Sequence, residues 1–299
     1  MLDSDMSTNP SRRLLATLFA PRAQAWLQET EQAHILYVFD RVINLVNQEG
    51  NILALANPQI GPGPFSLVFE HGRFPDDVDA SANLLVFENG LWLGEWLIDA
   101  ESAQLWQPTP NWQATMGQRS RLSWVAQTIT DLLSLHSPAD SFARLVLDPL
   151  ASSTLPARIL QAAEQNIPLL FSGIAESNLS VISRAAKGLA GIGPGLTPAG
   201  DDLLLGVMHG LWATRPEAAA LCAAIAAAAA PRTHALSAAW LTVAASGEAG
   251  EPWHALIAAL ADQNQPLLHA AALRILPTGH TSGADALAGL LGVIRNSSS

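Results

Sequence analysis

The chain is poor in several residue types on which common functional sites depend. It has one cysteine, Cys222, and one lysine, Lys187, in 299 residues. A single cysteine excludes an intramolecular disulfide and a C-x-x-C motif, and its place in an alanine-rich run favours a buried, unreactive thiol. With 15 basic against 26 acidic residues, the formal net charge is −11. This balance disfavours nucleic acid and anionic membranes as partners, because both require a basic surface.

Other absences narrow the class of protein further. The sequence contains no H-E-x-x-H, G-x-S-x-G or Walker lysine motif, which disfavours a zincin, an α/β-hydrolase and a P-loop enzyme. Its longest apolar region, 203–230, is interrupted by charged residues and a proline, so we expect no membrane span. Arg12-Arg13 and the apolar run after them resemble a signal peptide, but the run is short and ends at Pro21. We therefore expect a cytoplasmic protein.

The most informative segment present is 191–206, which reads G-I-G-P-G-L-T-P-A-G-D-D-L-L-L-G. Its glycines permit positive φ angles and let the backbone approach a ligand closely. Thr197-Pro198 predicts a helix N-cap and first helical position, so free N–H groups and a helix N-terminus would favour an anion. Asp201 and Asp202 would repel that anion unless a divalent cation such as Mg²⁺, or an arginine, intervenes. Helix capping is the alternative role for both aspartates.

A second segment near the C-terminus repeats part of this pattern. Both contain G-x-D-x-L-x-G: one runs from Gly200 through Asp202 to Gly206, the other from Gly283 through Asp285 to Gly289. Each Asp shares a helical face with the glycine four residues later, so two helices could cross closely there with the carboxylates near each other. We therefore predict one shared pocket. The structural alternative is that the glycines only let helices pack and the aspartates only cap.

With these motifs, the chain resembles the bacterial family typified by the third subunit (AllH-like) of the catabolic oxamate carbamoyltransferase of allantoin degradation. The resemblance rests on 191–206 and on G-H-T-S-G-A-D-A-L-A-G at 279–289, with weaker matches at 231–237 and 42–55. It implies a subunit that works with an acyl-CoA-synthetase-like subunit and one further carbamoyltransferase subunit. It also implies phosphorolysis of a carbamoylated, oxalurate-like amide to carbamoyl phosphate and an oxamate-like product. It supplies no catalytic residues, so the roles below rest on chemistry.

Residue patterns predict an α+β protein with an antiparallel, β-rich, barrel-like N-terminal domain and an alanine-rich, all-helical domain. Short apolar or alternating runs fill 34–112, and Asn89-Gly90 predicts a type I′ hairpin turn. Residues 1–33 are expected to be a helical or irregular lead-in. From 115 to 299 helical periodicity dominates, and that domain carries the glycine-rich ligand loop.

Chemistry assigns roles to the polar residues of the helical half. We expect the catalytic groups to be Asp201, Asp202, His280 and Asp285, with a cation, if any, on the first two. We expect the substrate to be bound by Gly193, Gly195, Thr197, Gly200, Arg232, Thr233, Thr281 and Ser282. Arg232 would balance an aspartate or a bound anion, although it could equally be a surface arginine, and His280 could be structural. Lys187 is better explained as a charge at a helix C-terminus than as a phosphate ligand.

Two classes of function remain. In the first, the chain is an enzyme subunit that binds a small anionic, carbamoyl- or phosphate-bearing substrate at these residues. In the second, it is a non-catalytic assembly or regulatory subunit, and the same loop binds a ligand or a partner.

Overall fold

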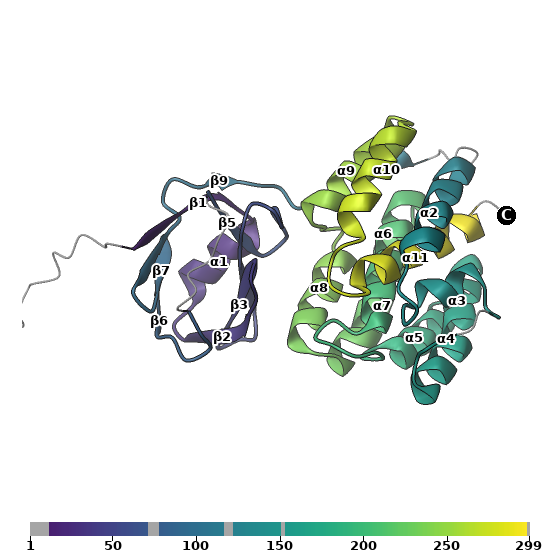
Figure 1. Ribbon diagram of the computed structural model, residues 1–299, viewed down its shortest axis with the longest axis horizontal. Helices are drawn as coiled ribbons and strands as arrows, with labels where there is room; N and C mark the ends of the chain where they lie inside the picture. Colours follow the sequence, from purple (N-terminus) through teal and green to yellow (C-terminus); the bar gives the residue numbers. More distant parts are fainter. Residues whose placement is uncertain (1–11, 71–77, 117–121, 151–152, 298–299) are drawn as a thin grey trace, which may run out of the picture. The chain divides into compact units, whose positions relative to one another are not determined.

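The computed structural model describes residues 12–70, 78–116, 122–150 and 153–297. It divides into two compact units, one up to Pro108 and one from Thr109 onwards. Figure 1 shows strands wrapped around one helix in the first unit and helices alone in the second. The α+β class and the barrel-like N-terminal sheet are therefore confirmed.

The first unit is a strongly curved mixed sheet around helix α1. Its elements are β1 (Arg13–Phe19), α1 (Pro21–Glu29), β2 (Ala33–Val38), β3 (Val42–Asn47), β4 (Ile52–Ala56), β5 (Ser66–Phe69), β6 (Leu84–Phe87), β7 (Gly90–Leu93), β8 (Trp96–Asp99) and β9 (Gln104–Leu105). The strand order is β2-β3-β4-β5-β1-β8-β7-β6, with β9 paired to β1. The two edge strands, β2 and β6, approach each other, so the sheet nearly closes.

The N-terminal segment differs from the expected lead-in. In the described part of 1–33, β1 lies in the middle of the sheet, antiparallel to β5 and parallel to β8. It can do so because alternate residues, Leu14 and Ala16, are buried in the barrel core. Helix α1 belongs to the same unit through buried Trp26, whose Nε1 donates to the Asn51 carbonyl oxygen at 2.9 Å. Residues 1–11 lie outside the described residues.

The sheet also corrects two expectations about its pairing. It is not purely antiparallel, because β4 pairs β5 and β1 pairs both β8 and β9 in parallel. The hairpin between β6 and β7 exists, but Phe87 pairs with Gly90, so the turn residues are Glu88 and Asn89. Neither Asn89 nor Gly90 has a positive φ, which excludes type I′. Gly90 is needed instead because a Cβ there would overlap the backbone oxygen of Ile98.

The second unit begins with a 3₁₀ turn (Trp112–Thr115) and is otherwise helical. Its helices are α2 (Leu122–His136), α3 (Ala143–Leu147), α4 (Ala157–Ala175), α5 (Leu179–Leu189), α6 (Ala199–Thr214), α7 (Ala218–Ala229), α8 (Ala235–Ala245), α9 (Glu251–Ala261), α10 (Gln265–Ile275) and α11 (Ser282–Ser297). A further 3₁₀ turn, Ala230–Arg232, joins α7 to α8. The helical character predicted from periodicity is confirmed for this unit.

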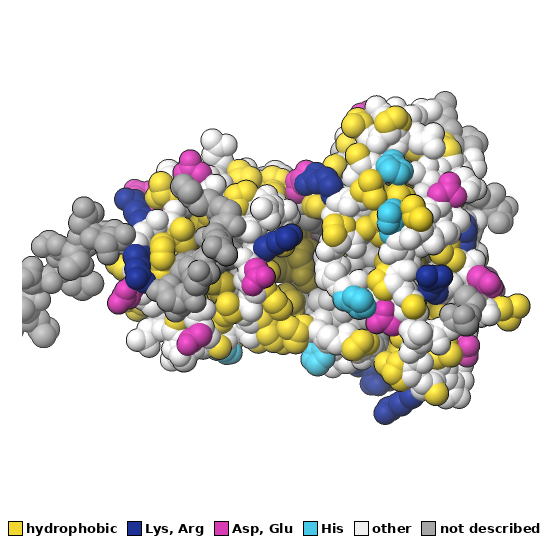
Figure 2. Space-filling model, viewed as in Figure 1, with side chains coloured by type: hydrophobic (Ala, Val, Ile, Leu, Met, Phe, Trp, Pro, Cys, Tyr) yellow, Lys and Arg dark blue, Asp and Glu magenta, His cyan; other side chains and the backbone are white. Residues whose placement is uncertain are grey.

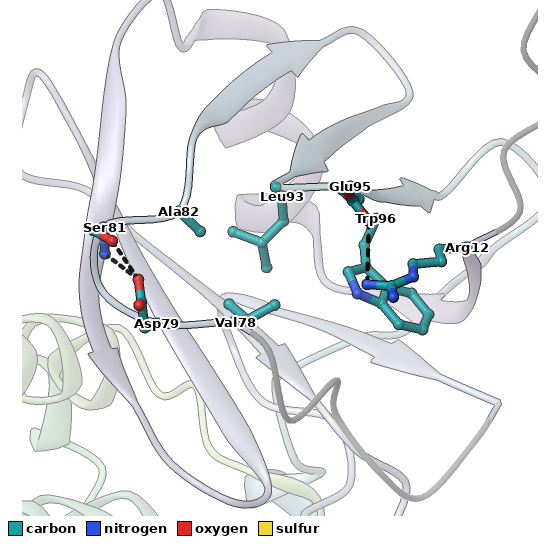
Figure 3. Close-up of a pocket in the computed structure, with 9 residues that line it drawn as sticks. Arg12, Val78, Asp79, Ser81, Ala82, Leu93, Glu95 and Trp96 are labelled. Atoms are coloured by element: carbon teal, nitrogen blue, oxygen red, sulfur yellow. Dashed lines mark hydrogen bonds and ion pairs between the residues drawn. The ribbon is translucent and has the colours of Figure 1, made fainter.

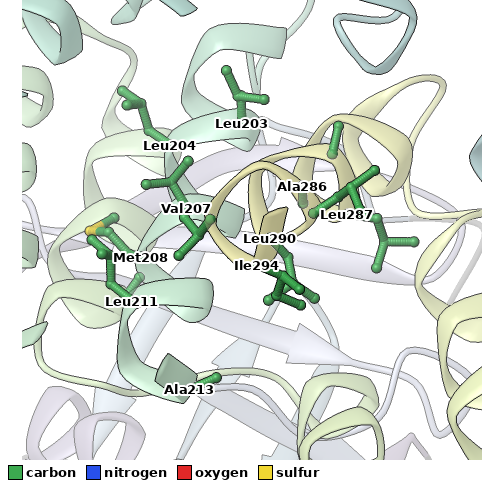
Figure 4. Packing of buried hydrophobic residues seen from close by; sticks show 14 of the residues in the cluster. Leu203, Leu204, Val207, Met208, Leu211, Ala213, Ala286, Leu287, Leu290 and Ile294 are labelled. Atoms are coloured by element: carbon green, nitrogen blue, oxygen red, sulfur yellow. The ribbon is translucent and has the colours of Figure 1, made fainter. Parts of the chain in front are cut away.

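Helices α6 and α11 form the centre of this unit. From 283 to 294, every residue of α11 is buried, as expected for a helix surrounded by other helices. Figure 4 shows the apolar side chains that meet where α6 and α11 cross, among them Leu203, Val207 and Leu290. The crossing is close because a Cβ at Gly206 would overlap the Ala286 carbonyl oxygen, and one at Gly289 would overlap that of Leu203. The predicted glycine-mediated crossing is confirmed.

Candidate functional site

The candidate site lies where the N-terminal ends of α6 and α11 meet. The hydroxyl oxygens of Thr197, just before α6, and Ser282, the first residue of α11, are 3.0 Å apart. The predicted meeting of the two glycine motifs, 85 positions apart at this contact, is therefore confirmed. Thr197 is not the N-cap, because Pro198 occupies that position and no side chain caps the helix. Its hydroxyl is used across the helix crossing instead.

The glycine loop has the expected backbone and leaves its amides available. Gly191, Gly193 and Gly195 have φ angles of 69°, 131° and 90°. Gly200 is helical, and its lack of a side chain lets α6 approach the Leu189 carbonyl oxygen. Among the described residues, no hydrogen bond is donated by the backbone N–H groups of Gly193, Gly195, Leu196 and Thr197. Four donors thus remain on one half-exposed loop beside a helix N-terminus, an arrangement suited to an anion.

Asp201 anchors this loop. One of its carboxylate oxygens accepts from the Gly191 N–H at 2.9 Å, and the other accepts from the Thr233 hydroxyl. Burial raises the pKa of Asp201, while these hydrogen bonds, Ser237 and the charge of His234 oppose the rise. Asp201 therefore ties the loop to the segment before α8 and has a structural role. Thr233 reaches the site through this carboxylate.

Asp285 is held by a segment that sequence reasoning missed. It is fully buried, and its Oδ1 accepts from the Ser141 hydroxyl at 2.6 Å and from the Phe142 and Ala143 N–H groups at 2.7 and 3.3 Å. Its Oδ2 is buried and has no hydrogen-bond partner among the described residues. Burial raises the pKa of Asp285 to about 7, against opposing contributions from the hydroxyls of Ser141 and Thr281. The carboxyl group therefore exchanges its proton near neutral pH.

Asp202 is the second carboxyl group at the crossing. Its Oδ2 is likewise buried without a hydrogen-bond partner in the described part of the chain. Burial raises the pKa of Asp202 well above its usual value, and the charges of Asp285 and Asp201 raise it further, while the hydroxyls of Ser282 and Thr197 oppose the rise. Two neighbouring buried carboxyl groups without a cation cannot both ionise at low cost, so the charge of one disfavours ionisation of the other.

Two other predicted residues, Arg232 and His280, form no ion pair with these carboxyl groups in the described part of the chain. Arg232 is exposed and forms no ion pair with Asp201 or Asp202 in the described structure, so it does not balance either aspartate. Binding of an anion by Arg232 stays a prediction. Its backbone oxygen instead packs against Gly191. His280 is exposed on the loop before α11, where its Nε2 lies 3.1 Å from an oxygen of Asp140.

The described residues contain no group of three or more His, Cys, Asp or Glu side chains that could hold a metal ion. Asp201 already uses both oxygens for Gly191 and Thr233, so the two adjacent aspartates do not fit a shared metal centre. The divalent cation stays a prediction, and no step below depends on it.

His209 is a buried polar residue to which sequence reasoning gave no role. Its ring lies between those of Trp112 and Trp253, with centroid distances of 5.9 and 4.5 Å. Burial lowers its pKa to about 3, so the ring is neutral at physiological pH. Its surroundings are those of a packed core residue. The sequence alone does not indicate that a histidine inside an apolar run packs between two tryptophans.

Two cavities lie outside the crossing. One, of about 410 Å³, is in the sheet unit, where the Arg12 guanidinium lies over the Trp96 ring at 5.5 Å and 3.4 Å from Glu95 (Figure 3). The other, of about 460 Å³, is mainly apolar and lies between α3, α4 and α11, with Phe171 and Arg295 in its lining. Neither includes a predicted site residue.

Charge on the surface agrees with the composition. Figure 2 shows the described Lys and Arg side chains scattered singly or in pairs on the face in view. Among the described residues, no helix is long and apolar enough to cross a membrane.

The fold and the site together define an α+β protein. Where two helices of its helical part cross, it has a pair of buried carboxyl groups and a glycine loop with available backbone amides. Comparison with protein families then matches residues 12–105 to the AllH family N-terminal domain. Residues 189–294, which contain both glycine motifs, match oxamate carbamoyltransferase subunit AllH. The chain therefore belongs to the AllH family of oxamate carbamoyltransferase subunits. Searches of curated proteins and of solved structures give no match.

Proposed function

We propose that the chain is a catalytic subunit of an oxamate carbamoyltransferase complex and that its substrate binds at the crossing of α6 and α11. The family supports membership of such a complex. The observation that carries the catalytic role is the pair of buried Oδ2 atoms on Asp202 and Asp285, which lack hydrogen-bond partners among the described residues. Buried acceptors of this kind are costly to leave unpaired, and active sites are where such groups occur.

The chemistry of the site matches a carbamoyl-bearing anion. The carbamoyl NH₂ group is a donor for the oxygens of Asp202 and Asp285, whereas phosphate or carboxylate oxygens are acceptors for the loop amides between Gly193 and Thr197. The substrate is oxalurate-like in this proposal. A phosphate oxygen bonds to the carbamoyl carbon and the bond from that carbon to the amide nitrogen breaks, giving carbamoyl phosphate and an oxamate-like product.

The reaction requires a proton transfer, and we assign this transfer to the carboxyl pair. The attacking phosphate loses a proton and the departing amide nitrogen gains one, so one proton must cross the site. With a pKa of about 7, Asp285 can give a proton to the nitrogen and recover one from the phosphate. The carboxyl group of Asp202 lies beside it, and burial raises the pKa of that group as well.

The lack of positive charge at the carboxyl pair supports a role for partner subunits in completing the site. The Asp202–Asp285 pair has no ion-paired arginine or histidine among the described residues, whereas phosphate requires cationic or strong donor groups during transfer. We propose that an acyl-CoA-synthetase-like subunit and a further carbamoyltransferase subunit assemble with this chain in the cytoplasm, and that one of them supplies these groups. If the partners supply the carboxyl groups as well, this chain is an assembly or regulatory subunit.

The proposal is tested by reconstituting the complex without this chain, with the wild-type chain and with the Asp202→Asn variant. Asparagine keeps the shape of the side chain without its proton exchange, so carbamoyl phosphate formation by the complex should fall at least ~100-fold. The free energy of unfolding should not fall, because the variant no longer buries a carboxyl group. Asp262→Asn, at an exposed aspartate at the end of α9, is the matched control. A near wild-type rate for Asp202→Asn would establish the non-catalytic alternative.

A further inference from the structure

Asp285 is fixed by one oxygen only, and the group that fixes it lies outside both glycine motifs. Ser141 is fully buried just before α3, and its hydroxyl meets Asp285 from 144 positions away in the sequence. We propose that Ser141 is a positioning residue that fixes Asp285 by its Oδ1 and leaves Oδ2 as the atom that exchanges a proton with the substrate. This inference rests on the function proposed above for its effect on catalysis.

The hydrogen bonds around Ser141 determine the direction of its hydroxyl group. Its Oγ accepts from the Ala143 N–H at 3.0 Å. Because that N–H occupies a lone pair of the oxygen, the hydroxyl hydrogen is directed to Asp285 Oδ1, 2.6 Å away. Ser141 is therefore a committed donor, and turning its hydroxyl hydrogen away would leave Oδ1 without its shortest hydrogen bond.

The two oxygens of Asp285 consequently differ in basicity. Oδ1 receives the Ser141 hydroxyl and the amides of Phe142 and Ala143, whereas Oδ2 receives no hydrogen bond from the described residues. An oxygen that already accepts three hydrogen bonds is a poor site for a proton, so the proton is added to Oδ2. The same contacts prevent the carboxyl group from rotating, which keeps Oδ2 in one place during proton transfer.

The cations on the elements around α11 are engaged elsewhere and do not compete with Ser141. Arg144 of α3 donates to the Ser137 carbonyl oxygen, and Arg295 of α11 donates to Val146 and Thr130. Arg274 of α10 pairs with Glu251, and His280 pairs with Asp140. Of the acids on α6, Asp202 interacts electrostatically with Asp285, and Asp201 interacts with Asp202. The remaining ionisable side chains of α2, α4 and α10 are exposed: Asp131, His136, Arg158, Glu164 and His269.

A double-mutant cycle with Ser141→Ala and Asp285→Asn in the reconstituted complex tests this role. Loss of a hydrogen bond to a charged group predicts a kcat for Ser141→Ala about 10- to 100-fold below wild type, with KM changed by less than about 3-fold. In the Asp285→Asn background, Ser141→Ala should have less than about a 2-fold further effect, because its partner is already altered. The matched control is Ser137→Ala, since Ser137 Oγ is buried nearby and has no partner among the described residues.

A second measurement uses the isolated full-length chain and does not depend on catalysis. Carboxyl ¹³C NMR titration of Ser141→Ala should place the pKa of Asp285 about one unit above that of wild type, because a donor to the ionised form is lost. Ser141→Cys, which keeps a weak donor, should give a smaller rise and covers the case in which the alanine variant does not fold. Ser137→Ala should not shift this pKa.

The outcomes separate the two proposals. If Asp285→Asn is inactive but Ser141→Ala matches Ser137→Ala, or if the two losses are additive, the positioning role is overturned and the proposed function stands. If Asp285→Asn turns over at the wild-type rate, the catalytic function is overturned, and the NMR titration alone then decides whether Ser141 controls the carboxyl group. An unshifted titration of Asp285 in both Ser141 variants overturns the inference in either case.

Discussion

Replacing Asp285 by asparagine should change how the stability of this protein depends on pH. The side chain is fully buried, and burial raises its pKa from 3.8 to about 7. Asparagine retains an acceptor oxygen for Ser141, Phe142 and Ala143 but does not titrate. The wild-type protein and the variant should therefore differ in the slope of stability against pH.

The sign and size of the effect follow from proton linkage. The folded state binds the proton of Asp285 more tightly than the unfolded state, so this contribution to stability is present below about pH 4 and is lost as the pH rises to about 7. The pKa of Asp285 differs by about three units between the folded and unfolded states. About two of these units, or roughly 3 kcal/mol, are lost as the pH rises from 5 to 8. The variant should gain about this much stability relative to wild type over that interval. Relief of the repulsion on Asp202 acts in the same direction.

Denaturant unfolding followed by far-ultraviolet circular dichroism measures this difference, because the signal comes mainly from the helical unit that contains Asp285. Curves at several pH values between 5 and 8 are needed for wild type, Asp285→Asn and the control Asp262→Asn, whose side chain is exposed at the end of α9. The control should run parallel to wild type. Parallel curves for Asp285→Asn as well would refute the assignment of a raised pKa to this carboxyl group.

Two further predictions concern the packing and the loop. Gly206→Ala should destabilise the helical unit by about 3 kcal/mol or more, because the new Cβ would overlap the Ala286 backbone oxygen. In the control Gly188→Ala, the nearest atoms to the new Cβ belong to the movable end of the Asn166 side chain. Equal losses of stability in thermal unfolding of the two variants would contradict the close crossing of α6 and α11. Thr233→Val should cost about 1–3 kcal/mol in urea unfolding, because it removes a donor from buried Asp201. Thr242→Val, where an exposed hydroxyl bonds only within α8, should have a much smaller effect, and equal losses would show that the Asp201 contact is unimportant.

The helical unit could be predicted closely because its signals are local. Periodic apolar residues mark each helix, and the spacing of Asp202 from Gly206 and of Asp285 from Gly289 indicates which faces can meet. The meeting of the two glycine motifs could be predicted for the same reason. The sheet was harder, because strand order depends on partners distant in sequence. Nothing in 13–19 indicates that β1 would lie between β5 and β8.

The side-chain partners within the site were the least predictable part. Charge predicts that Arg232 balances an aspartate or a bound anion, but in the structure the Thr233 hydroxyl beside it is the group that reaches the Asp201 carboxylate. Ser141 carries no motif and lies in a short segment before a five-residue helix. Its role depends on the hydrogen bonds it makes with Asp285 and Ala143, and these exist only in the folded structure.

The crossing of α6 and α11 has a consequence for synthesis on the ribosome. The glycine loop and α6 are translated about eighty residues before α11. At about 5–20 residues per second, the nascent chain therefore spends on the order of ten seconds with the Gly206 face of α6 uncovered and Asp285 missing. During that interval the apolar face of α6 that α11 covers in the folded chain stays exposed to water. A partner subunit that recognises the finished loop would engage only chains in which α11 has docked.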